Sequence, residues 1–266
     1  MISEAEGLDG VWGSIDERGV ARLEIDRPGQ LNALDGPASA RVIDLCRRWA
    51  ARDDVRVVIV SGRGGAFCAG ADVAGMAADA AQSGGFDASA SQAIIENGSN
   101  LVRAVRALPM PVIAAMDGPA VGIGASLAVA ADLVYATSRS YFLLAFVNIG
   151  LMPDGGATAL FAAAVGRARA NAMALLGERL PAAEAVDQGL VNACVEDPEG
   201  LAAVVDRVAT KLSRMSPQAL AATKVALDGH ALGGLDAAFG REIAGQTRLL
   251  QSPQFQQALA AFATER

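Results

Sequence analysis

The sequence predicts an α/β protein in which strands and helices alternate, followed by a region of helices alone. Short runs of aliphatic residues, such as residues 55–62 and 111–116, are typical of strands buried on both faces. Glycine-rich turns follow several of these runs and open helices. From about Gly166 onward the pattern is nearly all helical. We therefore expect an α/β core over residues 1–196 and a helical region over residues 197–266.

The expected strands are short runs rich in Val, Ile, Leu, Tyr or Phe. The first two strands flank a turn at residues 17–19. In the second of them, Leu23 and Ile25 alternate with the charged residues Arg22 and Glu24. The later runs are almost entirely apolar, as expected for strands with both faces covered. In order, the expected strands cover residues 11–16, 20–25, 55–62, 111–116, 132–137 and 140–146.

Helices are expected between and after these strands, with capping or helix-ending residues at several ends. Asp35 can cap the first helix, and Pro109 and Pro111 end the long helix before them. Another helix opens after the turn that ends at Val73, whereas residues 76–91 are small, polar and weakly patterned and predict a mobile surface segment. The remaining helices are expected over residues 36–51, 92–108, 125–131, 155–165, 167–176, 181–188, 201–213, 217–230, 235–250 and 253–264.

Composition excludes several classes of function. The 266 residues carry a net charge of −7 and no run of Lys or Arg, so nucleic acid is not an expected partner. One histidine, His230, and three cysteines rule out a histidine-based zinc site and a disulfide scaffold, so no metal is expected. Neither a signal peptide nor a clean apolar run of about 20 residues is present, so we expect no membrane contact and a cytoplasmic location.

Three glycine turns stand out, at residues 67–72, 118–126 and 150–158. Each follows a strand and opens a helix, so backbone N–H groups and the positive end of a helix can approach a negatively charged group. The phosphate-binding motif G-x-x-x-x-G-K-[ST] is absent, and the second turn does not complete a dinucleotide-binding motif. The turns predict a site that stabilises negative charge without identifying the ligand.

Five segments match the motifs of one known family in order and spacing. They are RPGQLNAL at residues 27–34, VRVVIVSGRGGAFCAGADV at 55–73, LPMPVIAAMDGPAVGIGASLAVAADLVYAT at 108–137, IGLMPDGGAT at 149–158 and GRARANAMALLGERLPAAEAVDQGLVNACV at 166–195. Over nearly its whole length the chain resembles the enoyl-CoA hydratase/isomerase (crotonase) superfamily. The resemblance implies a crotonase-like spiral of ββα units with a C-terminal helical trimerisation region, assembled as a homotrimer or homohexamer. It also implies acyl-CoA thioesters as substrates and no cofactor.

Family chemistry generates a thioester enolate, whose oxygen is held by two backbone N–H groups. The resemblance assigns the first to Ala71, in the A-G-A-D turn, and the second to Ile123, at the middle of the family's G-G-G turn. Ile123 is larger than the family's glycine, but a backbone donor survives that change. Asp72 also has the position of an N-cap for the helix that follows it. Contacts to CoA or substrate carry over to Arg27, Ala69, Gly70, Asp72 and Gly122.

The two carboxylates of the family's hydratases are replaced in this chain. Ser126 stands at the first glutamate position and Phe146 at the second. A serine and a phenylalanine cannot together activate water and protonate a carbon at neutral pH. The resemblance therefore argues against ordinary hydration.

Asp154, in the sequence GLMPDGG, is the remaining acid–base candidate. The chain resembles the ring-epoxide and Δ3,Δ2-enoyl-CoA isomerases of the superfamily from Phe146 onward, and in them the loop aspartate is the proposed single proton shuttle. A carboxyl group in an apolar loop can hold its proton near neutral pH. An aspartate before a helix also reads as a cap, here of residues 155–165, and both roles remain open.

The leading hypothesis is an acyl-CoA enzyme that shifts a double bond, with Asp154 moving the proton. The alternative is a non-catalytic acyl-CoA-binding protein that kept the oxyanion hole and lost both glutamates. An atypical enoyl-CoA hydratase is the third interpretation. The position of the Asp154 carboxyl relative to Ala71 and Ile123 distinguishes the first two.

Overall fold

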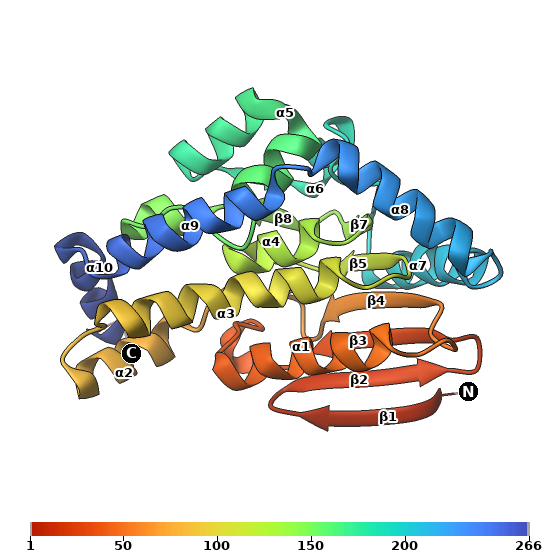
Figure 1. The fold of residues 1–266 in the computed structure, drawn as a ribbon, viewed down its shortest axis with the longest axis horizontal. Coiled ribbons are helices and arrows are strands. Elements are labelled where there is room, and N and C mark those ends of the chain that lie inside the picture. The colour runs from red at the N-terminus through yellow and green to blue at the C-terminus, as the bar shows by residue number, and fades with distance from the viewer. Residues whose placement is uncertain (1, 265–266) are drawn as a thin grey trace.

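The computed structural model describes residues 2–264, which form two β-sheets surrounded by helices (Figure 1). The larger sheet has seven strands in the order β1-β2-β3-β4-β5-β7-β10, antiparallel from β1 to β3 and parallel from β3 to β10. These strands are β1 (Ile2–Leu8), β2 (Val11–Asp16), β3 (Val20–Ile25), β4 (Val57–Gly62), β5 (Val112–Met116), β7 (Leu133–Thr137) and β10 (Ala193–Val195). The second sheet has the order β6-β8-β9 and consists of β6 (Pro119–Val121), β8 (Tyr141–Leu143) and β9 (Arg179–Pro181).

The chain passes from the large sheet to the small one and then into a helix, twice in succession. Strands β5 and β6 lead to α4 (Ile123–Val129), and β7 and β8 lead to η2 (Ala145–Ile149) and α5 (Ala157–Leu176). This is the spiral of ββα units that the family resemblance implies. It brings the turns after β6 and β8, which carry the expected site residues, into neighbouring positions.

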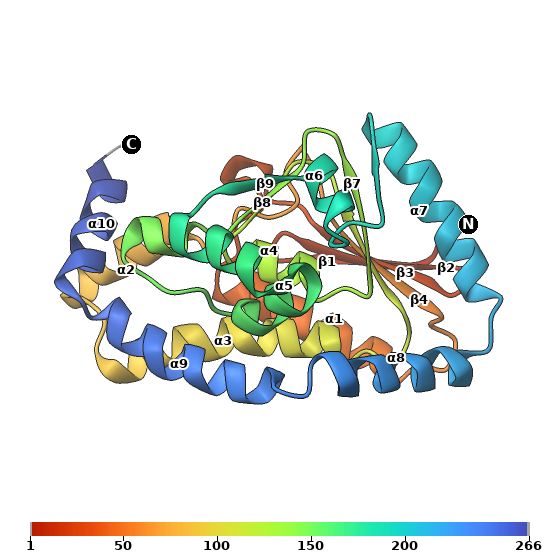
Figure 2. The same cartoon turned by 90° about the horizontal axis from the view of Figure 1, so that it is seen from above.

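The parallel strands are buried on both faces because successive side chains point to opposite sides of a sheet. On β4, Val57 and Ile59 pack against α7 (Pro198–Ser213), whereas Val58 and Val60 belong to the main core. Helix α7 lies on one side of these strands, and α1 (Gly36–Ala50) lies on the other (Figure 2). The apolar runs of the sequence therefore become strands covered on both faces.

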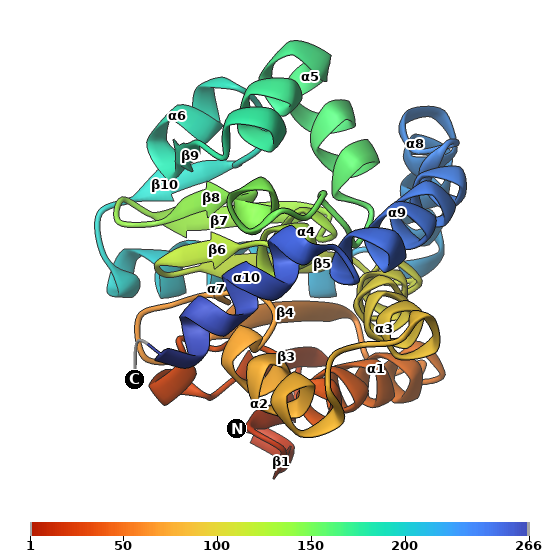
Figure 3. The ribbon, with the colours of Figure 1, turned by 90° about the vertical axis from the view of Figure 1, so that its left-hand side faces the viewer.

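Helices α3 (Ala88–Arg106) and α9 (Leu235–Leu250) pack along each other in the views of Figures 1 and 2. At one end of this pair, α10 (Pro253–Thr264) packs on α2 (Val73–Ser83), as Figure 3 shows. The C-terminal helices thus return across the helices of the core. The remaining helices are η1 (Pro28–Gln30), α6 (Ala182–Asp187) and α8 (Pro217–Ala231).

Most predicted elements are present, including α1, whose N-cap Asp35 accepts a hydrogen bond from the Ala38 N–H. Residues 76–91, expected as a mobile surface segment, lie mostly at the surface and form most of α2 and the start of α3, and their mobility stays a prediction. Helix α2 is rich in alanine, and Asp72 and Asp87 cap the N-termini of α2 and α3. The strand expected over residues 140–146 ends at Leu143, and the 3-10 helix η2 begins two residues later, at Ala145.

Four strands were not predicted: β1, β6, β9 and β10. Three of them have three residues each, which is too short to show an alternating pattern. The first mixes small, charged and apolar residues and pairs at the antiparallel edge of the large sheet. The sequence from Gly166 onward is therefore not purely helical.

One described helix, α5, is long and apolar enough by length and composition to cross a membrane. Its backbone is interrupted at Gly166, where φ is 75° and ψ is 160°. The interruption divides it into the two helices that the sequence predicts around this glycine. Each half is much shorter than the roughly 20 residues that a membrane-spanning helix needs.

The apolar residues of α9 and α10 pack on the core of the same chain, as the buried rings of Phe239 and Phe255 show. They therefore give no independent support for contacts between subunits. Exposed apolar side chains lie instead on α8, at Val225 and Leu227, and at the end of α5, at Leu175 and Leu176. The core boundary at residues 196 and 197 and the trimer or hexamer remain predictions.

Candidate active site

Two of the predicted glycine turns lie in direct contact. The Val121 N–H donates to the Cys68 carbonyl over 2.9 Å, and Cys68 forms a parallel bridge with Ala120. A Cβ on Gly70 would lie 2.8 Å from the Val121 carbonyl oxygen, so the backbones of the two turns approach closely. This contact brings the segment with Ala71 next to the segment that leads into Ile123.

Each turn has a backbone N–H at the position that the resemblance assigns to a donor. Gly70 and Asp72 are held by Leu34 through backbone hydrogen bonds of 2.8 and 3.0 Å, and Ala71 lies between them. Ile123 begins α4, so its N–H has no acceptor in the preceding turn of a helix. Within the part of the chain that the structure describes, neither the Ala71 nor the Ile123 N–H donates to a protein acceptor. Both N–H groups are therefore available for a ligand oxygen.

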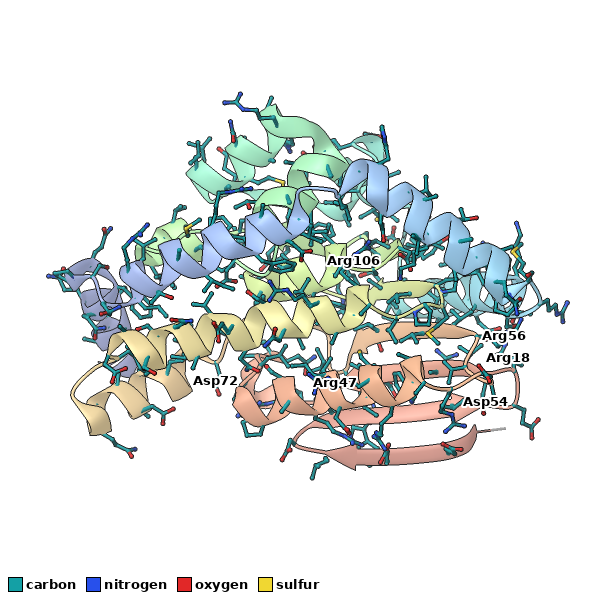
Figure 4. All side chains as sticks on the ribbon, viewed as in Figure 1. Arg18, Arg47, Asp54, Arg56, Asp72 and Arg106 are labelled. Carbon is teal, nitrogen blue, oxygen red and sulfur yellow. The ribbon has the colours of Figure 1, made fainter. Side chains whose placement is uncertain are left out.

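The predicted CoA-binding residues gather around the start of α2. Arg27 lies 2.6 Å from a carboxylate oxygen of Asp35 and 3.6 Å from one of Asp72. Asp72, which lies where α2 begins in Figure 4, accepts a hydrogen bond from the Gly75 N–H. It therefore acts as the N-cap of α2. The Ala69 N–H donates to the Leu31 carbonyl, which fixes the turn against the loop after Arg27.

Asn32 is a structural residue of this site that the sequence analysis missed. It is buried at a φ of 61°, and its side chain accepts from the Arg27 N–H and donates to the carbonyls of Arg63 and Ala66. It thus ties the Arg27 loop to the turn after β4. An asparagine in a proline- and glycine-rich loop was the available signal, because this residue type tolerates left-handed backbone conformations.

The two substituted glutamate positions have structural partners. Ser126 is fully buried, and its Oγ donates to the carbonyl oxygen of Asp154 over 2.8 Å. Phe146 is buried in η2, and a Cβ on Gly122 would lie 3.7 Å from its Cζ. The serine therefore holds the Asp154 loop, and the phenylalanine covers the turn before α4 with an apolar ring.

Ile123 fits this site because its neighbour on the Asp154 loop is a glycine. A Cβ on Gly155 would overlap the Ile123 Cδ1 atom, and one on Gly98 would lie 3.5 Å from it. Gly155 also has a φ of 65°, which L side chains rarely adopt. The Ile123 side chain therefore fills the space between α3 and the Asp154 loop and leaves its own N–H in place.

Asp154 is a buried carboxyl group beside this turn, with 9% of its surface exposed. Burial raises its pKa to about 7, and the nearby Glu242 charge acts in the same direction, whereas a hydrogen bond from Gln246 lowers the pKa. The Gln246 Nε2 donates to Asp154 Oδ2 over 3.2 Å. The other oxygen, Oδ1, is buried and has no hydrogen-bond partner among the described residues.

The carboxyl group of Asp154 does not cap α5. Glu242, from α9, accepts from the N–H groups of Gly156 and Thr158 over 2.6 and 2.9 Å, and from the Thr158 hydroxyl over 2.5 Å. The first turn of α5 is thus capped by a side chain from a distant part of the chain. Burial also raises the pKa of Glu242, while its three hydrogen bonds lower it. The Asp154 carboxylate is left free of a capping role.

Sequence analysis missed both Glu242 and Gln246. They lie four residues apart on α9, within a buried stripe that otherwise contains apolar and small residues. Both side chains are fully buried. The available signal was a pair of polar residues on the apolar face of an amphipathic helix, because buried polar groups require hydrogen-bond partners.

Other reactive groups do not join the site. Burial raises the pKa of the Cys68 thiol to about 12, so this thiol stays protonated at neutral pH. His230 is exposed on α8. Among residues 2–264, no group of three or more His, Cys, Asp or Glu side chains is placed to hold a metal ion.

Comparison with known proteins gives a consistent family. The model of the family described as enoyl-CoA hydratase/isomerase matches residues 16–266. A probable enoyl-CoA hydratase of Rhodobacter capsulatus is 36% identical over 248 residues, which cover 93% of each chain. The 1,2-epoxyphenylacetyl-CoA isomerase of Escherichia coli is 34% identical over 259 residues, with 94% of each chain covered. The crystal structure of an enoyl-CoA hydratase from Mycobacterium avium subsp. paratuberculosis matches with a TM-score of 0.86 at 42% identity, over 98% of both chains. The chain therefore belongs to the enoyl-CoA hydratase/isomerase family, within the crotonase superfamily.

Proposed function

We propose that this protein is an enoyl-CoA isomerase in which Asp154 is the only proton shuttle. The observation that carries the proposal is the state of the Asp154 carboxyl group: it is buried, it has one unpartnered oxygen, and its pKa is raised to about 7. Buried polar atoms are normally hydrogen-bonded, and an unpaired one calls for an explanation. An oxygen that receives and returns a substrate proton supplies that explanation.

The reaction needs two proton transfers and no water. Asp154 Oδ1 takes a proton from the carbon between the thioester and the double bond, and the electron pair of that C–H bond enters the conjugated system. The thioester oxygen becomes negatively charged, and the N–H groups of Ala71 and Ile123 hold it. Asp154 then returns the proton to the far carbon of the former double bond. The double bond moves into conjugation, and atoms and electrons balance.

The raised pKa of Asp154 suits both transfers. A group with a pKa near the working pH serves as base in one step and as acid in the next. An exposed aspartate, with an ordinary pKa near 4, would be a weak base and would rarely hold the returned proton. Burial of the loop is thus the physical cause of the proposed activity.

Replacement of the hydratase glutamates supports isomerisation over hydration. Ser126 offers a hydroxyl that is already engaged with the Asp154 carbonyl, and Phe146 offers no acid–base group. The isomerase name of the Escherichia coli relative is consistent with this chemistry, whereas the Rhodobacter capsulatus relative has a hydratase name. The choice therefore rests on the residues of this chain.

The substrate proposed for the site is an acyl-CoA thioester with no further cofactor. The segment around Ala69, Gly70 and Gly122 would receive the thioester end, and Arg27 would face the CoA portion. Two carboxylates already neighbour Arg27, so its contribution to phosphate binding would be reduced. We place the enzyme in the cytoplasm as a homotrimer or homohexamer.

The test is incubation of the purified protein with a 3-enoyl-CoA and, separately, a 2-enoyl-CoA, followed by ultraviolet absorbance and product mass. The proposal predicts conversion of the 3-enoyl-CoA into the conjugated 2-enoyl-CoA at unchanged mass. Rapid addition of one water to the 2-enoyl-CoA would identify a hydratase instead. Binding of acyl-CoA without turnover of either compound would identify a non-catalytic binding protein.

A further inference from the structure

We propose that Gln246 is the positioning residue of this enzyme: its carboxamide, delivered by the C-terminal helix α9, fixes one oxygen of Asp154 and leaves the other directed at the substrate. The proposal rests on the function proposed for Asp154. It assigns to the C-terminal helical region a direct part in arranging the acid–base group.

The Gln246 carboxamide bridges two points of the Asp154 loop. Its Nε2 donates to Asp154 Oδ2 over 3.2 Å, and its Oε1 accepts from the Met152 N–H over 3.0 Å. Because a carboxylate accepts and an N–H donates, these two partners fix which end of the amide faces which group. Pro153 lies between Met152 and Asp154, and it has no N–H and a restricted φ. The Gln246 side chain therefore holds the segment from Met152 to Asp154 at both of its ends.

Two further contacts hold the same loop from other directions. The Ser126 hydroxyl binds the Asp154 carbonyl from α4, and Glu242 binds the N–H groups at the start of α5. The main chain is thus held on both sides of Asp154, and Gln246 is the described side chain that holds the carboxyl group itself. Rotation of the carboxyl group would break that hydrogen bond, so Oδ1 keeps a defined direction.

Close packing of α9 explains why Gln246 can reach the loop. A Cβ on Gly245 would overlap the Met152 Sδ atom, so the helix backbone and the loop are in direct contact at this point. Gln246 is the next residue and is fully buried. Its placement therefore follows from the packing of α9 rather than from a flexible surface contact.

Gln246 and Glu242 have opposite effects on the proton affinity of Asp154. The hydrogen bond from Gln246 favours the charged form, and the Glu242 charge disfavours it. Among the described residues, Glu242 is the ionisable group whose charge acts on Asp154, and Arg241 in turn acts on Glu242. Loss of Gln246 should therefore leave Asp154 protonated up to a higher pH.

The experiment measures 3-enoyl-CoA isomerisation as a function of pH for the wild type, Gln246→Met, Gln246→Glu and Asp154→Asn. Gln246→Met keeps the size of the side chain and removes both hydrogen bonds. Gln246→Glu keeps an acceptor for the Met152 N–H and replaces the donor by a second carboxyl group. Gln251→Met is the matched control, because Gln251 is an exposed glutamine at the end of α9 whose side chain donates to the Thr247 carbonyl of the same helix.

On the acidic side of the pH profile, called the acid limb here, kcat falls as Asp154 becomes protonated. For Gln246→Met, we expect this fall to occur at a pH about one unit higher than in the wild type. The kcat should fall between about tenfold and a hundredfold with little change in KM, because the carboxyl group loses its alignment. Gln246→Glu should also move the limb upward, since two neighbouring carboxyl groups disfavour a second charge. Gln251→Met should match the wild type.

A Gln246→Met profile that superimposes on that of the wild type, while Asp154→Asn is inactive, would overturn the positioning role alone. Full activity of Asp154→Asn would overturn the proposed function and this inference with it. If Gln246→Met does not fold, Gln246→Glu decides, and an unshifted acid limb in that variant would overturn the inference.

Discussion

The ionisation of Asp154 sets the pH dependence expected for catalysis. As a base it must be deprotonated, and burial raises its pKa to about 7. We therefore expect kcat/KM for 3-enoyl-CoA isomerisation to fall about tenfold per pH unit below roughly pH 7. Initial rates measured between pH 5 and 9 test this. A flat profile down to pH 5 would show that another group moves the proton.

The same carboxyl group should make stability depend on pH. Its folded-state pKa lies above the ordinary value, so the folded state binds more protons than the unfolded state between about pH 4 and 7. The free energy of unfolding should therefore decrease as pH rises through this range. Asp154→Asn removes the group, and we expect it to be more stable than the wild type by on the order of 1–4 kcal/mol at pH 8.

Urea unfolding of both proteins at several pH values and one protein concentration measures this difference. Below about pH 3, the two proteins should have similar stability, because the Asp154 carboxyl group is then neutral in both the folded and the unfolded state. A difference between them that is independent of pH would contradict the raised pKa.

Ser126 should matter for the loop rather than for proton transfer. Ser126→Ala leaves the buried Asp154 carbonyl without its hydroxyl donor, which should cost about 1–3 kcal/mol of stability and reduce the isomerisation rate. Ser99→Ala is the matched control, because the Ser99 hydroxyl is equally buried and has no partner among the described residues. Equal behaviour of the two variants in unfolding and activity would argue against the loop contact.

At the residue scale, the sequence motifs predicted Asp154 but not which of two roles it has. An aspartate just before a helix is a common N-cap, and the local sequence around Asp154 cannot exclude that role. The cap comes from Glu242, which lies 86 positions after Gly156. Glu242 reaches the start of α5 only because α9 packs across it. The capping group of α5 could therefore be identified only from the three-dimensional structure.

At the scale of elements, Glu242 connects α9 to the N-terminus of α5. In Glu242→Gln, one of the two oxygens that accept from Gly156 and Thr158 is replaced by an NH₂ group. We expect a loss of about 1–3 kcal/mol in the free energy of unfolding. The substitution also removes a negative charge near Asp154, so the acid limb of the activity profile should move to lower pH, opposite to the effect of Gln246→Met.

Glu199→Gln, in the exposed first turn of α7, is the control for this substitution. It should leave the pH profile unchanged and alter stability only slightly. An upward movement of the acid limb in Glu242→Gln would contradict the assigned charge effect.

Long elements were predictable because their patterns repeat several times within the element. Helix α9 has the predicted bounds, Leu235–Leu250, and the buried parallel strands appear as apolar runs. Strands β6, β9 and β10 were not predictable, because three residues cannot display a period and their pairing depends on distant partners. The missed β6 is the strand that aligns the turn before Ile123 with Cys68.

At the scale of the whole molecule, helix α8 is attached to the core by charged contacts. Lys224 lies 2.8 Å from Asp132, and Arg106, which Figure 4 labels, pairs with Asp228. Val225 and Leu227 on the same helix are exposed, and they flank its charged face on either side. No residue of α8 is buried within its own chain, and exposed apolar residues on such a helix are typical of a surface that contacts another subunit.

We therefore expect a homotrimer or homohexamer in solution, with three or six times the 27.1 kDa mass of one chain. Sedimentation equilibrium at micromolar concentration measures this mass. A monomer under these conditions would contradict the expected assembly.

The most direct test of the proton shuttle is the isomerisation rate of Asp154→Asn with a 3-enoyl-CoA. Asparagine keeps the shape of the side chain and can still accept the Gln246 hydrogen bond, but it cannot take a proton from carbon. We expect the rate to fall at least about a hundredfold, with acyl-CoA affinity unchanged. Asp87→Asn, at the exposed N-cap of α3, serves as control and should keep wild-type activity. A wild-type rate in Asp154→Asn would contradict the assignment of Asp154 as the proton shuttle.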